Sequence, residues 1–285
     1  MSDPGAASNG RVIARFLRHR GAAAGLVVTA AFLLAALLAP WLSPFDPNAQ
    51  DLESGLSGAS AAHWLGQDKL GRDLLSRLLH GSRISVAVGL GTVAVSLSIG
   101  LLAGSASGFF GGRTDHLFMR ICDVLMAFPG ILLAIGMTAA MGPSLRNVLI
   151  ALSLLGWVGY ARLIRAQVMK VKEMEFVESA RAAGSPPARI LLFHVLPNAF
   201  SPILVEATFG ISRAIVAEAG LSFLGLGVAP PAPSWGAMIA EGRHFLFVAP
   251  HIAAVPGVAI MVAVMAFNLV GDGLRDAFDV REEIR

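Results

Sequence analysis

The chain has 285 residues, of which 55% are hydrophobic and only 14% are charged. Globular proteins carry roughly 25% charged residues, so this composition, with a mean hydropathy of +0.68, indicates a membrane protein. The net charge of +3 is small and the basic residues form no long patch, which argues against nucleic-acid binding. The single cysteine, Cys122, cannot form an intramolecular disulfide and is expected to be a small buried side chain.

Six apolar stretches are long enough to cross a membrane, which takes roughly 20 residues in a helix. They cover about residues 21–42, 84–107, 117–141, 147–165, 196–217 and 250–270. The first follows the basic segment "RVIARFLRHR", but its apolar run exceeds the roughly 7–15 residues of a signal-peptide core and no clear A-x-A site follows it. We therefore predict an all-α, polytopic membrane protein with six transmembrane helices, the first of them retained.

Basic residues give the predicted orientation, because loops rich in Arg and Lys stay in the cytoplasm. Four arginines flank the start of the first span: Arg11, Arg15, Arg18 and Arg20. The loops after spans two and four and the C-terminal tail then fall on the same side, with Arg113, Arg120, Arg162, Arg165, Lys170, Lys172, Arg181, Arg189, Arg275, Arg281 and Arg285. We predict that both termini are cytoplasmic, although the outer loop between spans one and two also carries basic residues, mixed with acidic ones.

That outer loop contains the segment "WLGQDKLGRDLLSRLLHGSR", in which leucines recur at helical spacing. The leucines are Leu70, Leu74, Leu75, Leu78 and Leu79, with polar residues between them. This pattern predicts a short amphipathic helix at the membrane interface. We expect this helix to pack on the outer ends of the bundle rather than to form a ligand site.

The largest predicted cytoplasmic loop holds the segment "EFVESARAAGSPPARILLFHVLPN", residues 175–198. Good helix formers and early acidic residues predict a first helix from Glu175 to Ala183. Its apolar residues can share one face, which would comprise Phe176, Val177, Ala180 and Ala183. Gly184 supplies a helix stop, because glycine readily adopts the left-handed conformation that ends many helices.

A second helix is predicted directly after this stop. Ser185 can cap it, with Pro186 at its first position. It should continue to Val195 and stop near Pro197, where span five begins. Two short helices at an angle, joined rigidly to a transmembrane helix, form a lever, so a partner that grips the first helix could move span five.

This loop resembles one that importer permeases of the ATP-binding-cassette (ABC) superfamily carry, of the form E-A-A-x3-G-x9-I-x-L-P. Here Glu178-Ser179-Ala180 is followed by three residues, Gly184, nine residues and His194-Val195-Leu196-Pro197, so Ser179 replaces an alanine and His194 the isoleucine. Further segments are similar to the dipeptide, oligopeptide and nickel branch: "HWLGQDKLGRDLLSRLLHGSRIS", "GLSFLGLGVAPPAPSWGAMIAEGR" and "NLVGDGLRDAFD". The resemblance covers nearly the whole chain and is to the second membrane subunit of that branch, which has a separate N-terminal helix before a five-helix core.

The resemblance implies a permease subunit in the cytoplasmic (inner) membrane of a bacterium or archaeon, forming half of a pathway for di- or oligopeptides or similar small solutes. It implies four kinds of partner: a homologous second permease subunit, two cytoplasmic ATP-binding subunits, an extracytoplasmic substrate-binding protein and the lipid membrane. It also implies four regions: a cytoplasmic tail (1–20), an N-terminal transmembrane helix and outer loop with the amphipathic helix (21–82), the permease core (83–275) and a second cytoplasmic tail (276–285).

The first loop helix would be the coupling helix that enters a groove on an ATPase. Its coupling residues would be Glu175, Phe176, Val177, Glu178, Ser179, Ala180, Ala183 and Gly184. No G-x-x-x-x-G-K-[ST] phosphate loop is present in the sequence. The chain is therefore expected to bind no cofactor and to catalyse no reaction, with ATP-Mg held by the partner ATPase subunits.

Two charged residues, Glu206 and Arg213, lie inside predicted span five, where a charge costs roughly 2.5–3.5 kcal/mol on insertion scales. They are seven residues apart, nearly two turns, and so point to a similar face. That separation is expected to be too long for a direct pair within the helix. Two roles are equally favoured for these residues: they line a central pathway, or they make polar contacts between helices inside the bundle.

The segment "GLSFLGLGVAPPAPSWGAMIAEGRHF" is rich in glycine and proline and is predicted to re-enter the outer mouth of the bundle. Trp235 is predicted to anchor it at the interface. His244 and His251 lack the helical spacing of metal ligands, so no metal site is predicted.

Three alternatives remain. A nickel or opine importer permease is the alternative within the class. An ion-coupled secondary transporter, in which Glu206 would carry protons, leaves the cytoplasmic helix pair unexplained. A membrane enzyme is disfavoured, since neither a nucleophile–base constellation nor an H-E-x-x-H zinc motif is visible.

Overall fold

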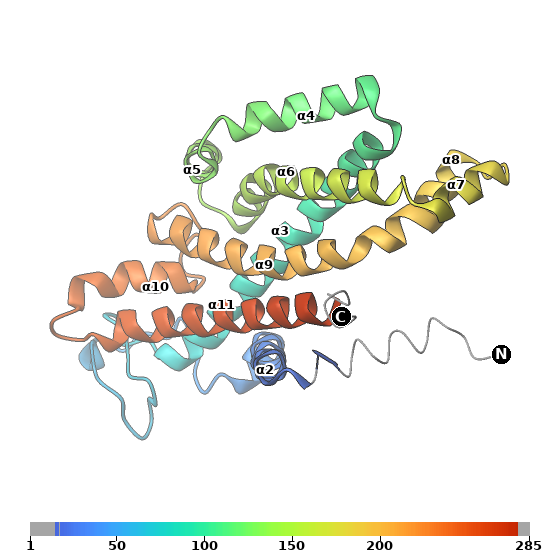
Figure 1. Ribbon diagram of the computed structural model, residues 1–285. Helices are drawn as coiled ribbons and strands as arrows, with labels where there is room; N and C mark the ends of the chain where they lie inside the picture. The colour runs from blue at the N-terminus through green and yellow to red at the C-terminus, as the bar shows by residue number, and fades with distance from the viewer. Residues whose placement is uncertain (1–14, 17, 279–285) are drawn as a thin grey trace.

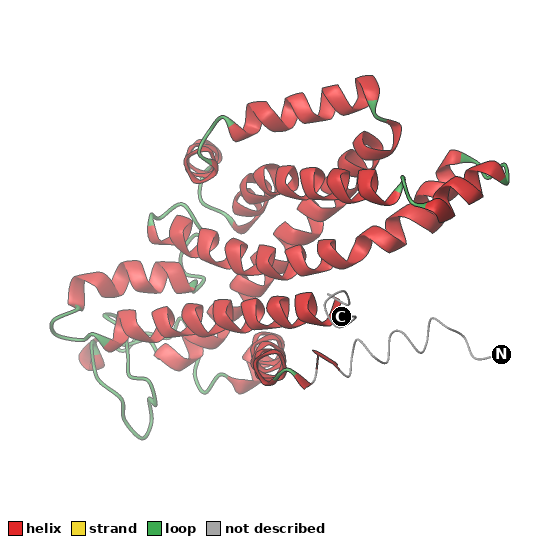
Figure 2. Ribbon diagram, in the orientation of Figure 1, coloured by secondary structure: helices red, strands yellow, loops and turns green. Residues whose placement is uncertain are grey.

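The computed structural model describes residues 15–16 and 18–278. Its α-helices are α2 (Arg20–Leu42), α3 (Leu74–Phe110), α4 (Gly112–Met126), α5 (Gly130–Met141), α6 (Leu145–Val171), α7 (Glu175–Ala182), α8 (Pro187–Ile190), α9 (Leu196–Phe223), α10 (Trp235–Gly242) and α11 (His251–Phe278) (Figure 1). Three short helical turns are η1 (Leu52–Ser54), η2 (Leu191–Val195) and η3 (Arg243–Phe245). No β-strand occurs within these described residues, so the predicted all-α class is confirmed (Figure 2). Much of the predicted tails, with Arg11, Arg281 and Arg285, lies outside the described residues.

Within the described residues, five helical stretches are long and apolar enough to cross a membrane: α2, α3, α6, the continuous stretch from α8 through α9, and α11. The third predicted span, about residues 117–141, is broken rather than straight, because α4 and α5 meet at an angle of 81°. Pro129 accounts for the break, since proline disfavours a helical conformation of the residue before it and has no N–H for the helix to use. Figure 1 shows the bend, with α5 seen along its axis beside α4.

The close packing of α3 on α6 is made possible by three glycines of α3. Gly100, Gly104 and Gly108 recur every four residues on the face toward α6. A Cβ atom at Gly104 would lie 2.4 Å from the Ala161 carbonyl oxygen, and one at Gly108 would lie 2.7 Å from the Arg165 carbonyl oxygen. Small residues at this spacing let two transmembrane backbones approach closely.

Polar contacts join α3, α4 and α6 at the end of the bundle that carries α7. Asp115 of α4 accepts hydrogen bonds of 2.5 and 2.7 Å from Arg165 of α6, and another of 2.5 Å from Ser107 of α3. Lys172, directly after α6, donates to the Gly108 carbonyl oxygen at 3.0 Å. This end of the bundle is therefore cross-linked by charge-assisted hydrogen bonds, which are among the stronger ones in proteins.

The predicted amphipathic helix of the first loop does not form as a separate element. Residues 64–73 are turns and irregular structure, and the leucines from Leu74 onward are the first turns of α3. Asp73 begins that helix, because its carboxylate accepts hydrogen bonds of 2.7 Å from both the backbone N–H and the hydroxyl of Ser76. Leu74 is fully buried against α10 and α11 instead of lying at an interface.

Trp235, the first residue of α10, is not an interfacial anchor as predicted. Its side chain is buried, and its indole N–H donates a hydrogen bond of 2.9 Å to the Leu78 carbonyl oxygen. Gly81 provides the space for the ring, since a Cβ atom there would lie 2.7 Å from Trp235 Cδ1. The tryptophan therefore fixes α10 to the start of α3.

Candidate functional site: coupling loop and pathway wall

Helix α7 ends in a Schellman motif, as the glycine at its end predicts. Gly184 has φ +78°, in the left-handed region. The Ser185 N–H bonds to the Ala180 carbonyl oxygen at 3.1 Å, and the Gly184 N–H bonds to the Arg181 carbonyl oxygen at 3.0 Å. This pair of bonds satisfies carbonyls that a helix end would otherwise leave open.

The apolar residues of α7 do not share one face, which corrects the prediction. Val177 is fully buried and Ala180 is half-buried, in a cluster with Ile190 of α8 and Val195 of η2. Phe176 lies on the side of the helix that faces away from this cluster, and it is 40% exposed. Val177 therefore attaches α7 to the bundle and leaves Phe176 available to something outside the chain.

The outward surface of α7 is polar around that phenyl ring. Its exposed residues before the glycine are Glu175, Phe176, Glu178, Ser179, Arg181, Ala182 and Ala183. The Ser179 hydroxyl donates to the Glu175 carbonyl oxygen at 2.9 Å, within the helix. Among the predicted coupling residues, Val177 and Ala180 thus pack against the rest of the bundle, and the others lie at the surface.

The second loop helix begins one residue later than predicted and does not end near Pro197. Pro186 is the N-cap and Pro187 the first helical residue, and no side chain caps this helix, so Ser185 does not take the predicted role. The helical stretch then continues from residue 187 to residue 223 without a break, through Pro197 and Pro202.

A π-helical turn explains how the helix passes Pro197. In η2 the Leu196 N–H bonds to the Leu191 carbonyl oxygen, one residue further back than in an α-helix. The Asn198 side-chain amide donates to the His194 carbonyl oxygen at 2.7 Å. Such substitutes let transmembrane helices contain proline, and here they keep the loop helix and span five in one piece.

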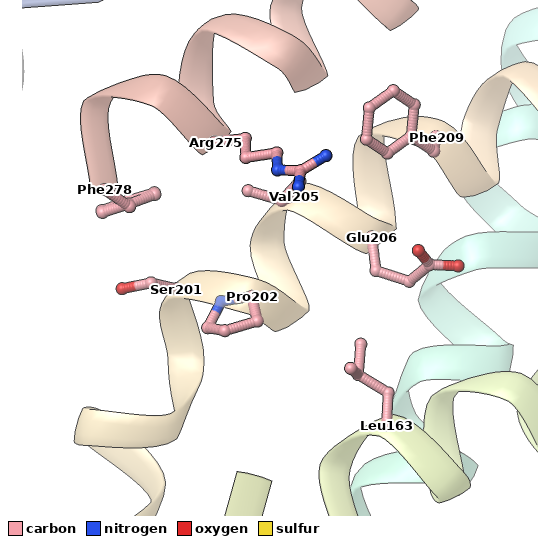
Figure 3. A pocket seen from close by; sticks show the side chains of 8 residues that line it. All are labelled: Leu163, Ser201, Pro202, Val205, Glu206, Phe209, Arg275 and Phe278. Atoms are coloured by element: carbon pink, nitrogen blue, oxygen red, sulfur yellow. The ribbon is translucent and has the colours of Figure 1, made fainter. Parts of the chain in front are cut away.

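The second candidate site is a hollow strip along α9. Three adjoining cavities of about 360, 520 and 600 Å³ share lining residues from this helix. The α9 residues that line them recur at helical spacing, namely Pro202, Glu206, Phe209, Arg213, Ala217 and Gly220. Figure 3 shows side chains that line the cavity of about 360 Å³, among them Glu206 and Phe209 of α9, Leu163 of α6 and Arg275 of α11. Residues 202–220 of α9 therefore present one hollowed face.

Glu206 and Arg213 form a direct ion pair within α9, contrary to the prediction. Arg213 Nη2 donates to Glu206 Oε1. Seven residues correspond to a rise of about 10 Å, but both side chains are long and extend toward each other along the open face. The Arg213 side chain is 61% exposed and that of Glu206 is 35% exposed, so the pair lies on the wall of the hollow. Both residues therefore fit the pathway-lining alternative.

Tyr160 of α6 lines the hollow on the side of the bundle core. It was not among the residues predicted for this site. Its side chain is buried, and its hydroxyl donates to the Glu206 carbonyl oxygen at 3.5 Å. A Cβ atom at Gly210 would lie only 2.1 Å from that hydroxyl oxygen. The available signal was that this is the chain's one tyrosine and lies within a predicted span.

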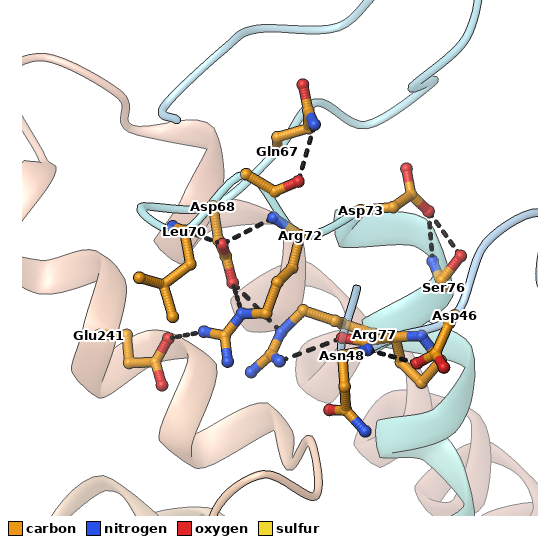
Figure 4. Close-up of polar contacts among 12 residues, drawn as sticks. Asp46, Asn48, Gln67, Asp68, Leu70, Arg72, Asp73, Ser76, Arg77 and Glu241 are labelled. Atoms are coloured by element: carbon orange, nitrogen blue, oxygen red, sulfur yellow. Dashed lines mark hydrogen bonds and ion pairs between the residues drawn. The ribbon is translucent and has the colours of Figure 1, made fainter. Parts of the chain in front are cut away.

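A buried charge cluster at the opposite end of the bundle joins the first loop to α10 (Figure 4). Arg72 donates to Asp68 at 2.6 Å and to Glu241 of α10 at 2.6 Å. Arg77 Nε lies 3.4 Å from the same Asp68 carboxylate. Both arginines are buried, so this end of the bundle is tied by charges that lose much of their hydration on burial.

No metal-ligand cluster accompanies these sites in the described part of the chain. Within residues 15–16 and 18–278, no group of three or more His, Cys, Asp or Glu side chains could hold a metal ion. Cys122 is buried, in a cluster with Trp157 and Ala161 of α6.

Comparisons with known proteins place these features in context. Residues 96–283 match the family described as "Binding-protein-dependent transport system inner membrane component", and residues 10–57 match "N-terminal TM domain of oligopeptide transport permease C". The glutathione transport system permease protein GsiD of Pectobacterium atrosepticum is 47% identical over 267 residues, covering 93% of this chain and 88% of that protein. The di/tripeptide transport system permease protein DppC of Pseudomonas aeruginosa is 43% identical over 270 residues, covering 93% of this chain and 89% of that protein.

A solved structure has a similar fold. An inward-facing conformation of the methionine ABC transporter MetNI aligns with a TM-score of 0.57 at 18% identity, covering 70% of this chain and 96% of the matched chain. At this identity the likeness is one of fold.

Proposed function

This chain belongs to the family of binding-protein-dependent transport system inner membrane components, and from that membership we propose how it works. It is a multi-pass permease subunit of an ABC importer. We propose that it forms half of a translocation pathway for small peptides, and that α7 docks on a cytoplasmic ATPase subunit and transmits its movement to that pathway.

One observation carries this proposal: the loop helix and the pathway wall belong to one mechanical unit. Val177 packs α7 onto Ile190 and Val195, and the same uninterrupted helix of 37 residues bears the hollow face. Because packed helices move as rigid elements rather than deforming continuously, a displacement of α7 would be transmitted along α9 to Glu206 and Arg213.

The proposed docking surface is the exposed face of α7 with its terminal glycine. Phe176 is the apolar anchor, with Glu175, Glu178 and Ser179 around it. An aromatic side chain surrounded by polar residues is the usual composition of an interface centre and rim. Ala183 and Gly184 would let the partner approach the turn closely, while Val177 and Ala180 hold the helix from the other side.

The proposed complex contains a homologous second permease subunit, two cytoplasmic ATP-binding subunits and an extracytoplasmic substrate-binding protein. In it both termini and α7 face the cytoplasm, and the charge cluster of Arg72 and Glu241 lies outside. The partner ATPase subunits would hold ATP-Mg, and this chain would neither bind a cofactor nor catalyse a reaction. The regions 1–20, 21–82, 83–275 and 276–285 are proposed as its divisions.

The proposed substrates are small peptides. The support is that relatives 47% and 43% identical to this chain are named for transport of glutathione, and of di- and tripeptides. A nickel or opine importer is the alternative within the class, and ion-coupled secondary transport is the alternative from another class.

The docking surface is tested with Phe176→Asp, which puts a charge at the proposed apolar anchor. We expect the membrane subunits to assemble and the ATPase subunits to be lost when the complex is purified through this chain, since an unpaired charge at an interface centre is costly. Phe247→Asp is the matched control, because Phe247 is fully exposed at the other end of the bundle, between η3 and α11. Normal ATPase content and normal uptake in the Phe176 variant would remove the docking assignment.

A further inference from the structure

The hollow of α9 has a feature that a plain conduit would not need: two opposite charges on one wall. We propose that Glu206 and Arg213 form a binding site for the termini of the permeating peptide, with Glu206 receiving its ammonium group and Arg213 its carboxylate. This inference rests on the proposed transport function and names the chemistry that the pathway recognises, a zwitterionic peptide backbone with free ends.

The first support is the unused bonding capacity of the pair. Among the described residues, the Glu206 and Arg213 side chains are joined to each other by a single ion pair and form no hydrogen bond or ion pair with any other side chain. A guanidinium has five N–H donors, and a carboxylate accepts several hydrogen bonds. Most of this capacity faces the hollow, in a transmembrane helix where charged groups are costly and mark functional pathways.

The second support is the placement of the charges along the cavities. The cavity of about 520 Å³ is lined by both residues. Glu206 also lines the cavity toward α7, and Arg213 lines the one toward the opposite end. A peptide passing along the strip therefore meets both charges in sequence.

The third support is the match in length. The Cα atoms of Glu206 and Arg213 differ by a rise of about 10 Å, and an extended peptide covers at most ~3.3–3.6 Å per residue. A di- or tripeptide therefore has charged ends at a separation that the two flexible side chains can reach once they part.

The fourth support is the neutral character of the remaining wall. Around the pair, the cavity is lined mainly by small or apolar residues, including Ile131, Gly156 and Gly159. Apart from Ser96 and Tyr160, such a wall offers few polar contacts to peptide side chains, so recognition would fall mainly on the termini that all such peptides share. Variation in peptide side chains would be tolerated for the same reason.

The exchange keeps the charges balanced. One contact joins the two side chains, which are 61% and 35% exposed, so a ligand in the hollow can reach both charged groups and replace that contact. A zwitterion then pairs its ammonium group with Glu206 and its carboxylate with Arg213, and the net charge of the wall stays unchanged. When the peptide leaves, the two side chains pair again, which keeps binding weak enough for release, as conduction requires.

Saturation-transfer NMR tests the proposal, because it detects weak binding directly. The complete complex in nanodiscs, without the binding protein and without ATP, is mixed with dialanine, N-acetyl-dialanine or dialaninamide. We expect a signal from dialanine, and about tenfold weaker binding of each blocked peptide, since each loses one charge-assisted hydrogen-bonded contact. No dialanine signal, or equal binding of all three peptides to the wild-type complex, would overturn the proposal.

Two variants assign each end of the peptide. Arg213→Gln should abolish the preference for dialanine over its amide, and Glu206→Gln should abolish the preference over the N-acetyl form. Glu218→Gln is the matched control, because Glu218 lies on the same helix but is fully buried and lines none of these three cavities. Variants that keep both preferences would refute the site. ATP-dependent uptake by the wild-type complex, measured separately, shows whether the transport function itself holds.

Discussion

At the residue scale, the shape of the hollow depends on one close contact between helices. The Tyr160 hydroxyl occupies the position where any residue larger than glycine at position 210 would place its Cβ atom, 2.1 Å away. The same hydroxyl bonds to the backbone of α9 at Glu206. The buried Tyr160 therefore fixes the position of α9, the helix that carries the charge pair.

Gly210→Ala should lower the thermal stability of the complex, because overpacking of this kind costs about 1–3 kcal/mol. Tyr160→Phe removes the clashing oxygen, so the double variant should recover much of the loss. Thermal unfolding of the purified complex in nanodiscs measures both effects. Gly136→Ala is the control, since nothing lies within 4 Å of a Cβ atom there. Independent, additive losses from the two substitutions would contradict the contact.

Residue-level features divide clearly into those that sequence can predict and those it cannot. Gly184 was predictable because a helix stop depends on its own backbone and its immediate neighbours. The pair of Glu206 and Arg213 was missed because helical spacing describes Cβ positions and ignores the reach of long side chains. The partnership of Arg72 with Glu241 joins residues 169 apart, and nothing local in either segment specifies it.

At the element scale, α3 and α6 pack closely on each other, and α9 packs against both of them. The contact between α3 and α6 depends on the glycines at 100, 104 and 108 of α3, which place backbone against backbone. Five of the six spans were predictable from apolar length, since each must cross a membrane of fixed thickness. The bend within residues 117–141 was not predicted, because apolar length does not register it. The continuation of spans beyond the apolar core, as in α3 back to Leu74 and α9 back to α8, was not predictable either, because packing and capping determine it.

Gly104→Ala should separate α3 from α6, because the new methyl group would lie 2.4 Å from the Ala161 carbonyl oxygen. We expect a lower melting temperature and less folded complex in the membrane. Gly257→Ala in α11 is the control for an added methyl group in a transmembrane helix, as its surroundings are open. If both variants unfold at the wild-type temperature, the glycine stripe does not set this packing.

At the scale of the whole molecule, α7 and α10 lie at opposite ends of the bundle and are attached to it in different ways (Figure 1). At one end α7 is attached mainly through apolar side chains and a glycine turn, and it exposes a surface around Phe176. At the other end the Arg72 cluster and Trp235 fix the first loop, α3 and α10 to one another. This asymmetry suits a molecule that is moved from the α7 end and held at the other.

Uptake into vesicles of purified components tests this account most directly. Dialanine accumulation is measured with the ATPase subunits present or omitted, and with a proton gradient imposed or collapsed, for the wild type, Gly184→Val and Gly184→Asn. We predict uptake that requires the ATPase subunits and ATP and ignores the gradient. Valine should abolish it and asparagine should largely preserve it, because asparagine tolerates the left-handed backbone that Gly184 adopts at φ +78°. Gradient-driven accumulation by the membrane subunits alone, or normal ATP-driven uptake with valine at this turn, would contradict the account.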